Sequence, residues 1–194
     1  MIEINTSGIE KAVELIQHIP GAARKAQKRA ISRALKGAQK DAWKKIKERY
    51  AIGRGAGKSH FTDTMRTRIT DTGGVFSSKG RVNDLAYFKT KPTKVPKRRP
   101  AKGKYLWSQV VKGQGGSIAH AFLARMKSGH LGVFVRGKHG ESMSSLPIRK
   151  LAGPSTPQML GSPSVSEFIV KGIEQRLDKT MQHEVDAFLK GYRR

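Results

Sequence analysis

The chain has 194 residues, with 39 lysines and arginines against 14 aspartates and glutamates, and so a formal net charge of +25. It has no cysteine and no run of 18 apolar residues, which excludes disulfide bonds, cysteine-based zinc sites and a transmembrane helix. So large a positive excess predicts an anionic partner, and nucleic acid is the commonest one.

Residues 1–50 are expected to hold a pair of helices. A short amphipathic helix is predicted over "SGIEKAVELIQHI", and a helix of about eight turns from Pro20 to about Tyr50. Apolar residues recur along the long helix at steps of three and four, namely Ile31, Ala34, Leu35, Ala38, Ala42, Ile46 and Tyr50. Its other face is either solvated or a second phosphate-facing surface, and carries Lys25, Lys28, Arg29, Lys36, Lys40, Lys44 and Lys47.

The stretch "YAIGRGAGKSHF", residues 50–61, ends as a nucleotide-binding P-loop does, with Gly57, Lys58 and Ser59. The pattern G-x-x-x-x-G-K-[S/T] needs its first glycine at position 52, which is Ile52. A P-loop also follows a buried strand and opens a helix. Here the preceding residues indicate a helix end, and the following residues lack a helical apolar stripe. We interpret the stretch as a basic loop that binds neither ATP nor GTP.

Short alternating runs between glycine-rich breaks predict a central, mostly antiparallel sheet of four to six strands over residues 60–150. The sheet is interrupted by a long basic loop at residues 90–104, "TKPTKVPKRRPAKGK", whose composition cannot bury a core. The loop is either merely solvated or meets an anion. The second reading predicts that five cations face DNA and contact its phosphates without reading bases: Lys97, Arg98, Arg99, Lys102 and Lys104.

Residues 163–192 are predicted to form a long C-terminal amphipathic helix after a connector rich in proline and glycine. Its nearly neutral charge and wide apolar stripe suit both the core and a neighbouring subunit. The stripe comprises Val165, Phe168, Ile169, Ile173, Leu177, Met181, Val185, Phe188 and Leu189. The residues expected at the subunit interface are Phe168, Ile173, Leu177, Val185, Phe188 and Leu189. The whole chain, residues 1–194, is predicted to be a single α+β domain.

Catalytic signals are scarce. Acidic residues in the sheet region are limited to Asp63, Asp71, Asp84 and Glu141, all near predicted turns, whereas hydrolases and two-metal nucleases need clustered acids. No histidine pair has metal-ligand spacing, and no G-x-S-x-G elbow is present. We therefore predict a protein that is not an enzyme, with no catalytic residue, cofactor or metal site.

A more specific signal covers about residues 119–165. "AFLARMKSGHLGVFVRGK" and "LPIRKLAGPSTPQMLGSPSV", followed by an amphipathic helix, resemble the prophage minor tail protein Z family, the tail completion proteins of long-tailed phages. The features shared with the family include the Ser128-Gly129-His130 turn, the Leu146-Pro147-Ile148 step and the connector from Gly153 to Leu160. Over the first 50 residues only the general plan is similar.

The resemblance implies a structural virion protein at the head-proximal end of the tail, made in the host cytoplasm and needed for head-tail joining. It further implies a homo-oligomeric ring around the DNA channel, with six copies the expected number, in contact with neighbouring tail and neck proteins and with the DNA backbone, but not with a membrane. The alternative from composition alone is a cellular nucleic-acid-binding protein without sequence specificity.

Overall fold

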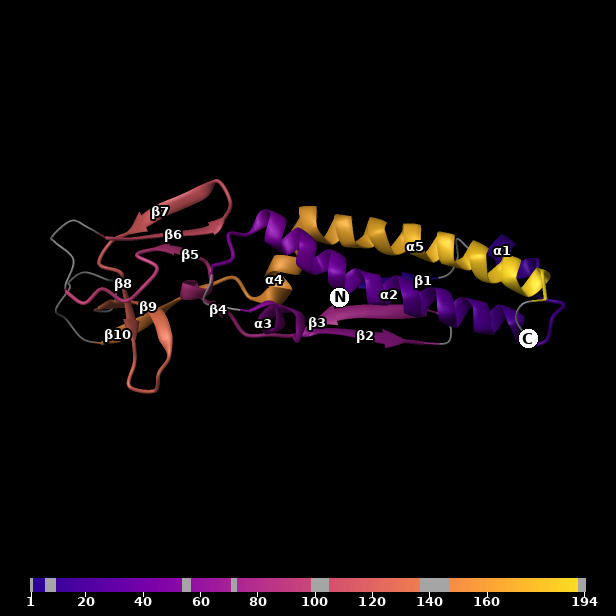
Figure 1. The fold of residues 1–194 in the computed structure, drawn as a ribbon, viewed down its shortest axis with the longest axis horizontal. Coiled ribbons are helices and arrows are strands. Elements are labelled where there is room, and N and C mark those ends of the chain that lie inside the picture. The colour runs from indigo at the N-terminus through magenta and orange to yellow at the C-terminus, as the bar shows by residue number, and fades with distance from the viewer. Residues whose placement is uncertain are drawn as a thin grey trace. The chain divides into compact units, whose positions relative to one another are not determined.

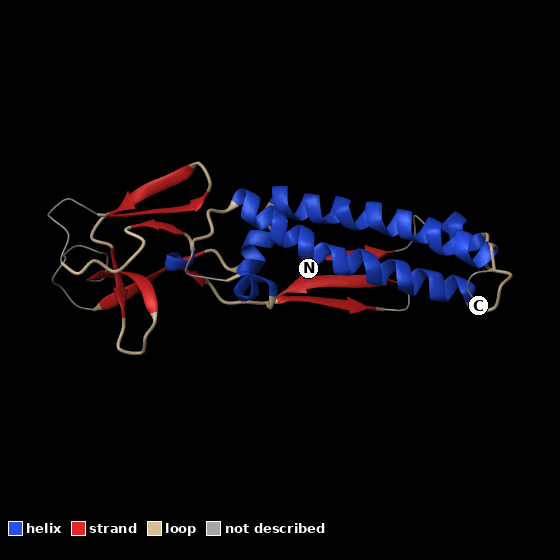
Figure 2. Ribbon diagram, in the orientation of Figure 1, coloured by secondary structure: helices blue, strands red, loops and turns tan. Residues whose placement is uncertain are grey.

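The computed structural model describes residues 2–5, 10–53, 57–70, 73–98, 105–136 and 147–191. Its helices are α1 (Glu10–Glu14), α2 (Ala22–Arg49), α3 (Lys58–Thr62), the 3-10 helix η2 (Leu85–Tyr87), α4 (Thr156–Leu160) and α5 (Pro163–Leu189). Its strands are β1 (Ile2–Asn5), β2 (Met65–Ile69), β3 (Gly73–Ser78), β4 (Asn83–Asp84), β5 (Lys89–Lys91), β6 (Leu106–Val111), β7 (Gln114–Ile118), β8 (Phe122–Arg125), β9 (Leu131–Arg136) and β10 (Ile148–Gly153). The predicted α+β class is confirmed (Figure 2).

The chain folds into two compact units. The first unit takes residues 1–45, 61–79 and 160–194, and the second takes residues 46–60 and 80–159. The chain therefore passes between the units four times. Neither unit is one continuous stretch of sequence. The single domain expected over residues 1–194 stays a prediction.

The first unit is built around α2, which lies between α5 and the sheet of strand order β1-β3-β2 (Figure 1). Alanines at every fourth position of α2 are fully buried: Ala22, Ala26, Ala30, Ala34, Ala38 and Ala42. Such small side chains let neighbouring elements approach the helix closely. On the sheet side, Gly74 of β3 leaves room for Leu35 and Ile31 of α2. The apolar stripe predicted for this helix is confirmed, since all its members are buried.

Charged contacts join α2 and α5 inside the first unit. Glu184 of α5 is fully buried, and its two carboxylate oxygens lie 3.3 Å from Arg29 Nη1 and 3.1 Å from Arg33 Nη1. Further along both helices, Arg176 Nη1 lies 2.5 Å from Asp41 Oδ2. Because these contacts lie at separate points along α2, together they define the register of the two helices.

The second unit contains two antiparallel sheets, with strand orders β4-β10-β9-β8 and β5-β6-β7. The backbone that follows α2 is anchored on this unit through isolated bridges from Tyr50 to Val111 and from Ile52 to Phe88. The sequence predicted one sheet of four to six strands, whereas the strands divide over three sheets in two units. The pattern of alternation marks strands, but it does not say which strands pair.

Three short elements differ from the sequence-based expectations. Strand β1 pairs with β3 but was not predicted, and α3 forms where a loop was expected. Strand β10 lies within residues 146–163, which were expected to form only a connector rich in proline and glycine, and it pairs with both β4 and β9. Its residues are mostly exposed, so its sequence shows little apolar alternation. Within the described residues, no helix is long and apolar enough to cross a membrane.

Candidate nucleic-acid interface

Positive charge is concentrated in the second unit. Its sequence holds 20 lysines and arginines and 3 acidic residues, a net charge of +17, whereas the first unit holds 19 and 11, a net charge of +8. An anionic partner is therefore attracted mainly to the second unit.

The sheet β5-β6-β7 presents one basic face to solvent. Directly opposed residues of antiparallel strands share a face, and the register of this sheet places six residues on one side: Lys89, Lys91, Trp107, Gln109, Gly115 and Ser117. We call this set the lysine–tryptophan face. The alternate residues Thr90, Leu106 and Ser108 are buried on the other side. The three strands contain no acidic residue, so nothing on them offsets the two lysines.

Trp107 lies across the middle of the lysine–tryptophan face. Its indole ring occupies the space above Gly115, where a Cβ atom would overlap ring carbon Cζ2. The Nζ atom of Lys91 lies 5.5 Å from the centroid of the ring, within reach of a cation–π interaction. Trp107 is partly buried.

The basic loop extends from the same sheet, because it connects β5 to β6. Every residue from 91 to 98 is exposed, including Lys94 and two of the predicted DNA-facing cations, Lys97 and Arg98. The other three predicted cations, Arg99, Lys102 and Lys104, lie outside the described residues. The loop leaves the sheet after Lys91 and returns to it at Leu106, next to Trp107, which is the residue opposite Lys91.

The competing basic surface lies on α2 in the first unit. Lys36, Lys40 and Lys44 are exposed there, as a phosphate-facing helix would require. Asp41 is on the same helix, however, and the first unit as a whole carries less than half the net charge of the second.

The predicted interface residues of α5 divide into two groups. Four of them, Ile173, Leu177, Val185 and Phe188, are buried in the first unit. The other two remain accessible, since Phe168 is 36% exposed and Leu189 is 51% exposed. The subunit interface stays a prediction, and the accessible pair is the part of it that a neighbour can reach.

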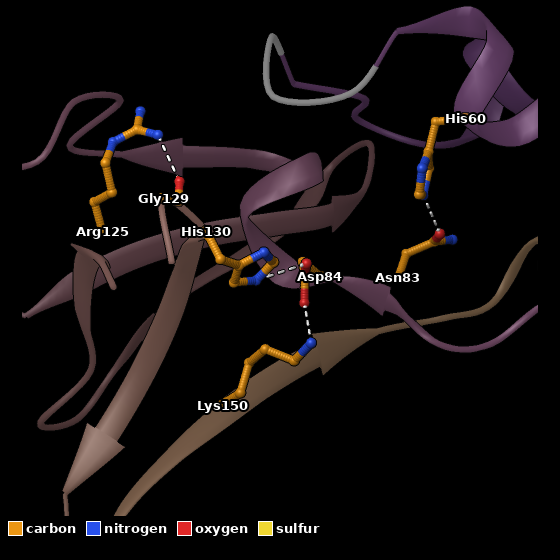
Figure 3. Close-up of polar contacts among 7 residues, drawn as sticks. All are labelled: His60, Asn83, Asp84, Arg125, Gly129, His130 and Lys150. Carbon is orange, nitrogen blue, oxygen red and sulfur yellow. Dashed lines mark hydrogen bonds and ion pairs between the residues drawn. The ribbon is translucent and has the colours of Figure 1, made fainter. Parts of the chain in front are cut away.

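A buried carboxylate organises the second unit at a place that sequence reasoning did not identify (Figure 3). Asp84 of β4 is 5% exposed, and one of its oxygens lies 2.6 Å from Lys150 Nζ of β10. The other oxygen lies 3.1 Å from Nε2 of His130, the residue directly before β9. These residues are far apart in the sequence, so no spacing pattern could reveal the cluster.

Neighbouring polar groups extend this cluster. Burial raises the pKa of Tyr87, and the charge of Asp84 raises it further, whereas Lys150 opposes the shift and a hydrogen bond to Asp84 adds to it. Asn83, next to Asp84, lies 2.9 Å from Nε2 of His60 and donates to the carbonyl of Pro154. Together with the contacts of Asp84 to His130 and Lys150, these hydrogen bonds hold β4 against β9 and β10, which indicates a structural role.

The cluster has only part of the chemistry that a catalytic centre needs. A carboxylate beside a histidine can orient the imidazole as a base, but in this cluster Lys150 neutralises the same carboxylate. Across the described part of the chain, no three histidine, aspartate or glutamate side chains gather as metal ligands.

The second unit also has a pocket of about 620 Å³, which is within the size range of ligand sites. Its lining is mainly apolar, with lysines and threonines at positions 89–94, and comprises Ile52, Gly53, Ala86, Phe88, Lys89, Thr90, Thr93, Lys94, Leu123 and Leu131. The lining contains no carboxylate or histidine that could serve as a general acid or base.

The P-loop-like stretch lies in the wrong structural context. Gly53 follows α2 and an isolated bridge rather than a strand, and the helix opened by Lys58 is only five residues long. Residues 54–56 lie outside the described part of the chain. These features favour the interpretation that the stretch binds neither ATP nor GTP.

A family model described as prophage minor tail protein Z (GPZ) matches residues 6–194, nearly the whole chain. Comparison with curated proteins and with solved structures gave no match.

Proposed function

Because the chain belongs to the prophage minor tail protein Z family, we propose that it is a tail completion protein that acts at the head-proximal end of the tail and is needed for head-tail joining. The family is one of phage minor tail proteins, so the role is structural and the location is the virion. The single observation that carries the proposal is a family match that extends from residue 6 to residue 194.

In this proposal several copies, six being the expected number, form a ring through which DNA passes. The division of charge supports such a role, because a strongly basic unit suits a DNA path and a less basic unit suits contacts with protein. The accessible α5 residues Phe168 and Leu189 are the proposed contacts with a neighbouring copy or a neck protein.

The proposal can be tested with a phage that lacks only the coding sequence of this chain. Its lysate should contain filled heads and separate tails, and adding the purified chain should restore infectious particles. The chain with Lys171→Gln and Lys179→Gln, two exposed positions on α5, is the positive control: it loses two positive charges and should still restore infectious particles. Normal particles without the chain would contradict the proposal. If the purified monomer instead bound free DNA tightly and did not affect joining, the cellular nucleic-acid-binding alternative would replace it.

A further inference from the structure

We propose that the lysine–tryptophan face binds the phosphate backbone of duplex DNA. The inference deepens the proposed function and rests on it, since DNA passing through the tail is the anion that this face would meet. Binding to purified DNA does not require tail assembly, so the two proposals can fail separately.

The positions of the lysines favour a backbone ligand. Lys89 and Lys91 are both exposed and point to the same side of β5, about 7 Å apart along the strand. They can therefore reach separate phosphates. Gln109 and Ser117 on the same face add side chains that hydrogen-bond to phosphate and sugar oxygens.

The third strand contributes little bulk to this face. Gly115 of β7 bears no side chain, and the indole ring of Trp107 lies over it. Trp107 lies between this strand and the lysines, and its indole N–H is a hydrogen-bond donor without acceptor capacity. A surface of donors and cations with no acidic residue is matched to phosphate oxygens.

The same composition argues against sequence reading. Base recognition in the major groove uses bidentate arginine, asparagine or glutamine side chains carried by a helix or a two-stranded ribbon that enters the groove. The lysine–tryptophan face contains a single residue of these types, Gln109. We therefore expect similar affinity for unrelated DNA sequences.

The salt dependence of binding provides the first test. The chain with Lys89→Gln and Lys91→Gln should bind duplex DNA with a log-affinity against log-salt slope shallower by about 1.8, at about 0.9 per lost phosphate contact. The control variant Lys171→Gln with Lys179→Gln removes the same charge from α5 and should leave the slope unchanged. A third variant, Lys36→Gln with Lys40→Gln, removes the same charge from α2, and its slope shows whether that surface binds DNA. An unchanged slope in the β5 variant, or an equal change in all three variants, would overturn the proposal.

Tryptophan fluorescence provides the second test, which does not depend on lysine substitutions. The chain has two tryptophans, and Trp43 stacks on Phe61 in the first unit. In Trp43→Phe, emission comes from Trp107 alone and should be quenched or shifted when duplex DNA is added. In Trp107→Phe, emission comes from Trp43 and should not change. A response from Trp43 without one from Trp107 would assign the DNA to the first unit and refute the proposal.

Discussion

Asp84 shows how one buried carboxylate can organise a sheet. Its carboxylate is almost completely buried, and removing a charge from water is costly unless partners compensate for it. Lys150 of β10 is its charged partner, His130 just before β9 lies beside it, and both are partly exposed. The carboxylate therefore holds β4 against β10, while the side chains of its partners remain partly hydrated.

Tyr87 reports on this cluster at high pH. Its pKa is raised above the ordinary value of 10.0 in the folded protein, first by burial and then by Asp84. The folded state thus retains a proton that the unfolded state loses, so this contribution to stability is complete below about pH 10 and is lost as the pH rises through the folded-state pKa. The free energy of unfolding should fall more steeply above pH 10 in the natural chain than in Tyr87→Phe. Parallel curves from urea titrations would contradict this assignment.

Gly115 tests the placement of Trp107. Gly115→Ala adds a methyl group that overlaps the indole ring, so the ring has to move, at a cost of about 1–3 kcal/mol in the free energy of unfolding. The adjacent Gly116 has no atom within 4 Å of an added Cβ, which makes Gly116→Ala a matched control. Urea denaturation and Trp107 emission, both in the Trp43→Phe background, measure the effect. Equal stability and emission in the two variants would show that the ring does not rest on Gly115.

Among the secondary-structure elements, α2 and α5 are joined by buried charge. Changing Arg29 and Arg33 together to alanine leaves Glu184 buried without either ion pair, and we expect a loss of about 3–5 kcal/mol in the free energy of unfolding. Glu184→Met removes the buried charge itself and should cost much less, because the exposed parts of both arginines can be hydrated. Chemical denaturation of the two proteins compares these losses. A larger loss in Glu184→Met would mean that the carboxylate makes a net stabilising contribution.

The long helices were predictable because their signals are local and repeated. The apolar positions of α2 recur over about eight turns, and the helix observed as Pro163–Leu189 was expected from residue 163 to residue 192. Residue 192 lies outside the described residues. By contrast, β4 has two residues and β10 is mostly exposed, so neither has an alternation that could be recognised.

The candidate site was predictable in its charge but not in its geometry. The basic loop was evident from composition, and Lys97 and Arg98 are indeed exposed. The lysine–tryptophan face required the register that sets Lys91 opposite Trp107, which depends on how the chain folds back after the loop. The close approach of Trp107 to Gly115 also depends on that register.

At the scale of the whole molecule, a net charge of +25 opposes self-assembly, because like-charged copies repel. Raising the salt concentration from about 0.1 M to about 1 M shortens the screening length from about 10 Å to about 3 Å. Self-association of the purified chain should therefore strengthen with salt, whereas its binding to DNA should weaken. Sedimentation velocity across this range measures the first effect, and weaker association at high salt would indicate a contact dominated by ion pairs.

The exposed end of α5 is the part of the predicted interface that can be tested without disturbing the core. Leu189→Asp should lower the yield of joined particles while circular dichroism stays unchanged, since Leu189 is 51% exposed. Val82→Asp, at a residue that is 58% exposed in the second unit, is the matched control. A normal yield of joined particles with Leu189→Asp would show that this residue is not part of the interface.

We propose that the chain completes the tail as a ring around the DNA path, and a cryo-electron microscopy reconstruction of the neck of the mature particle would reveal such a ring. We expect several copies of the chain in a closed ring between head and tail, with Lys89, Lys91 and Trp107 on the surface nearest the DNA. A neck that lacks the chain, or a ring that turns the lysine–tryptophan face away from the DNA, would contradict it.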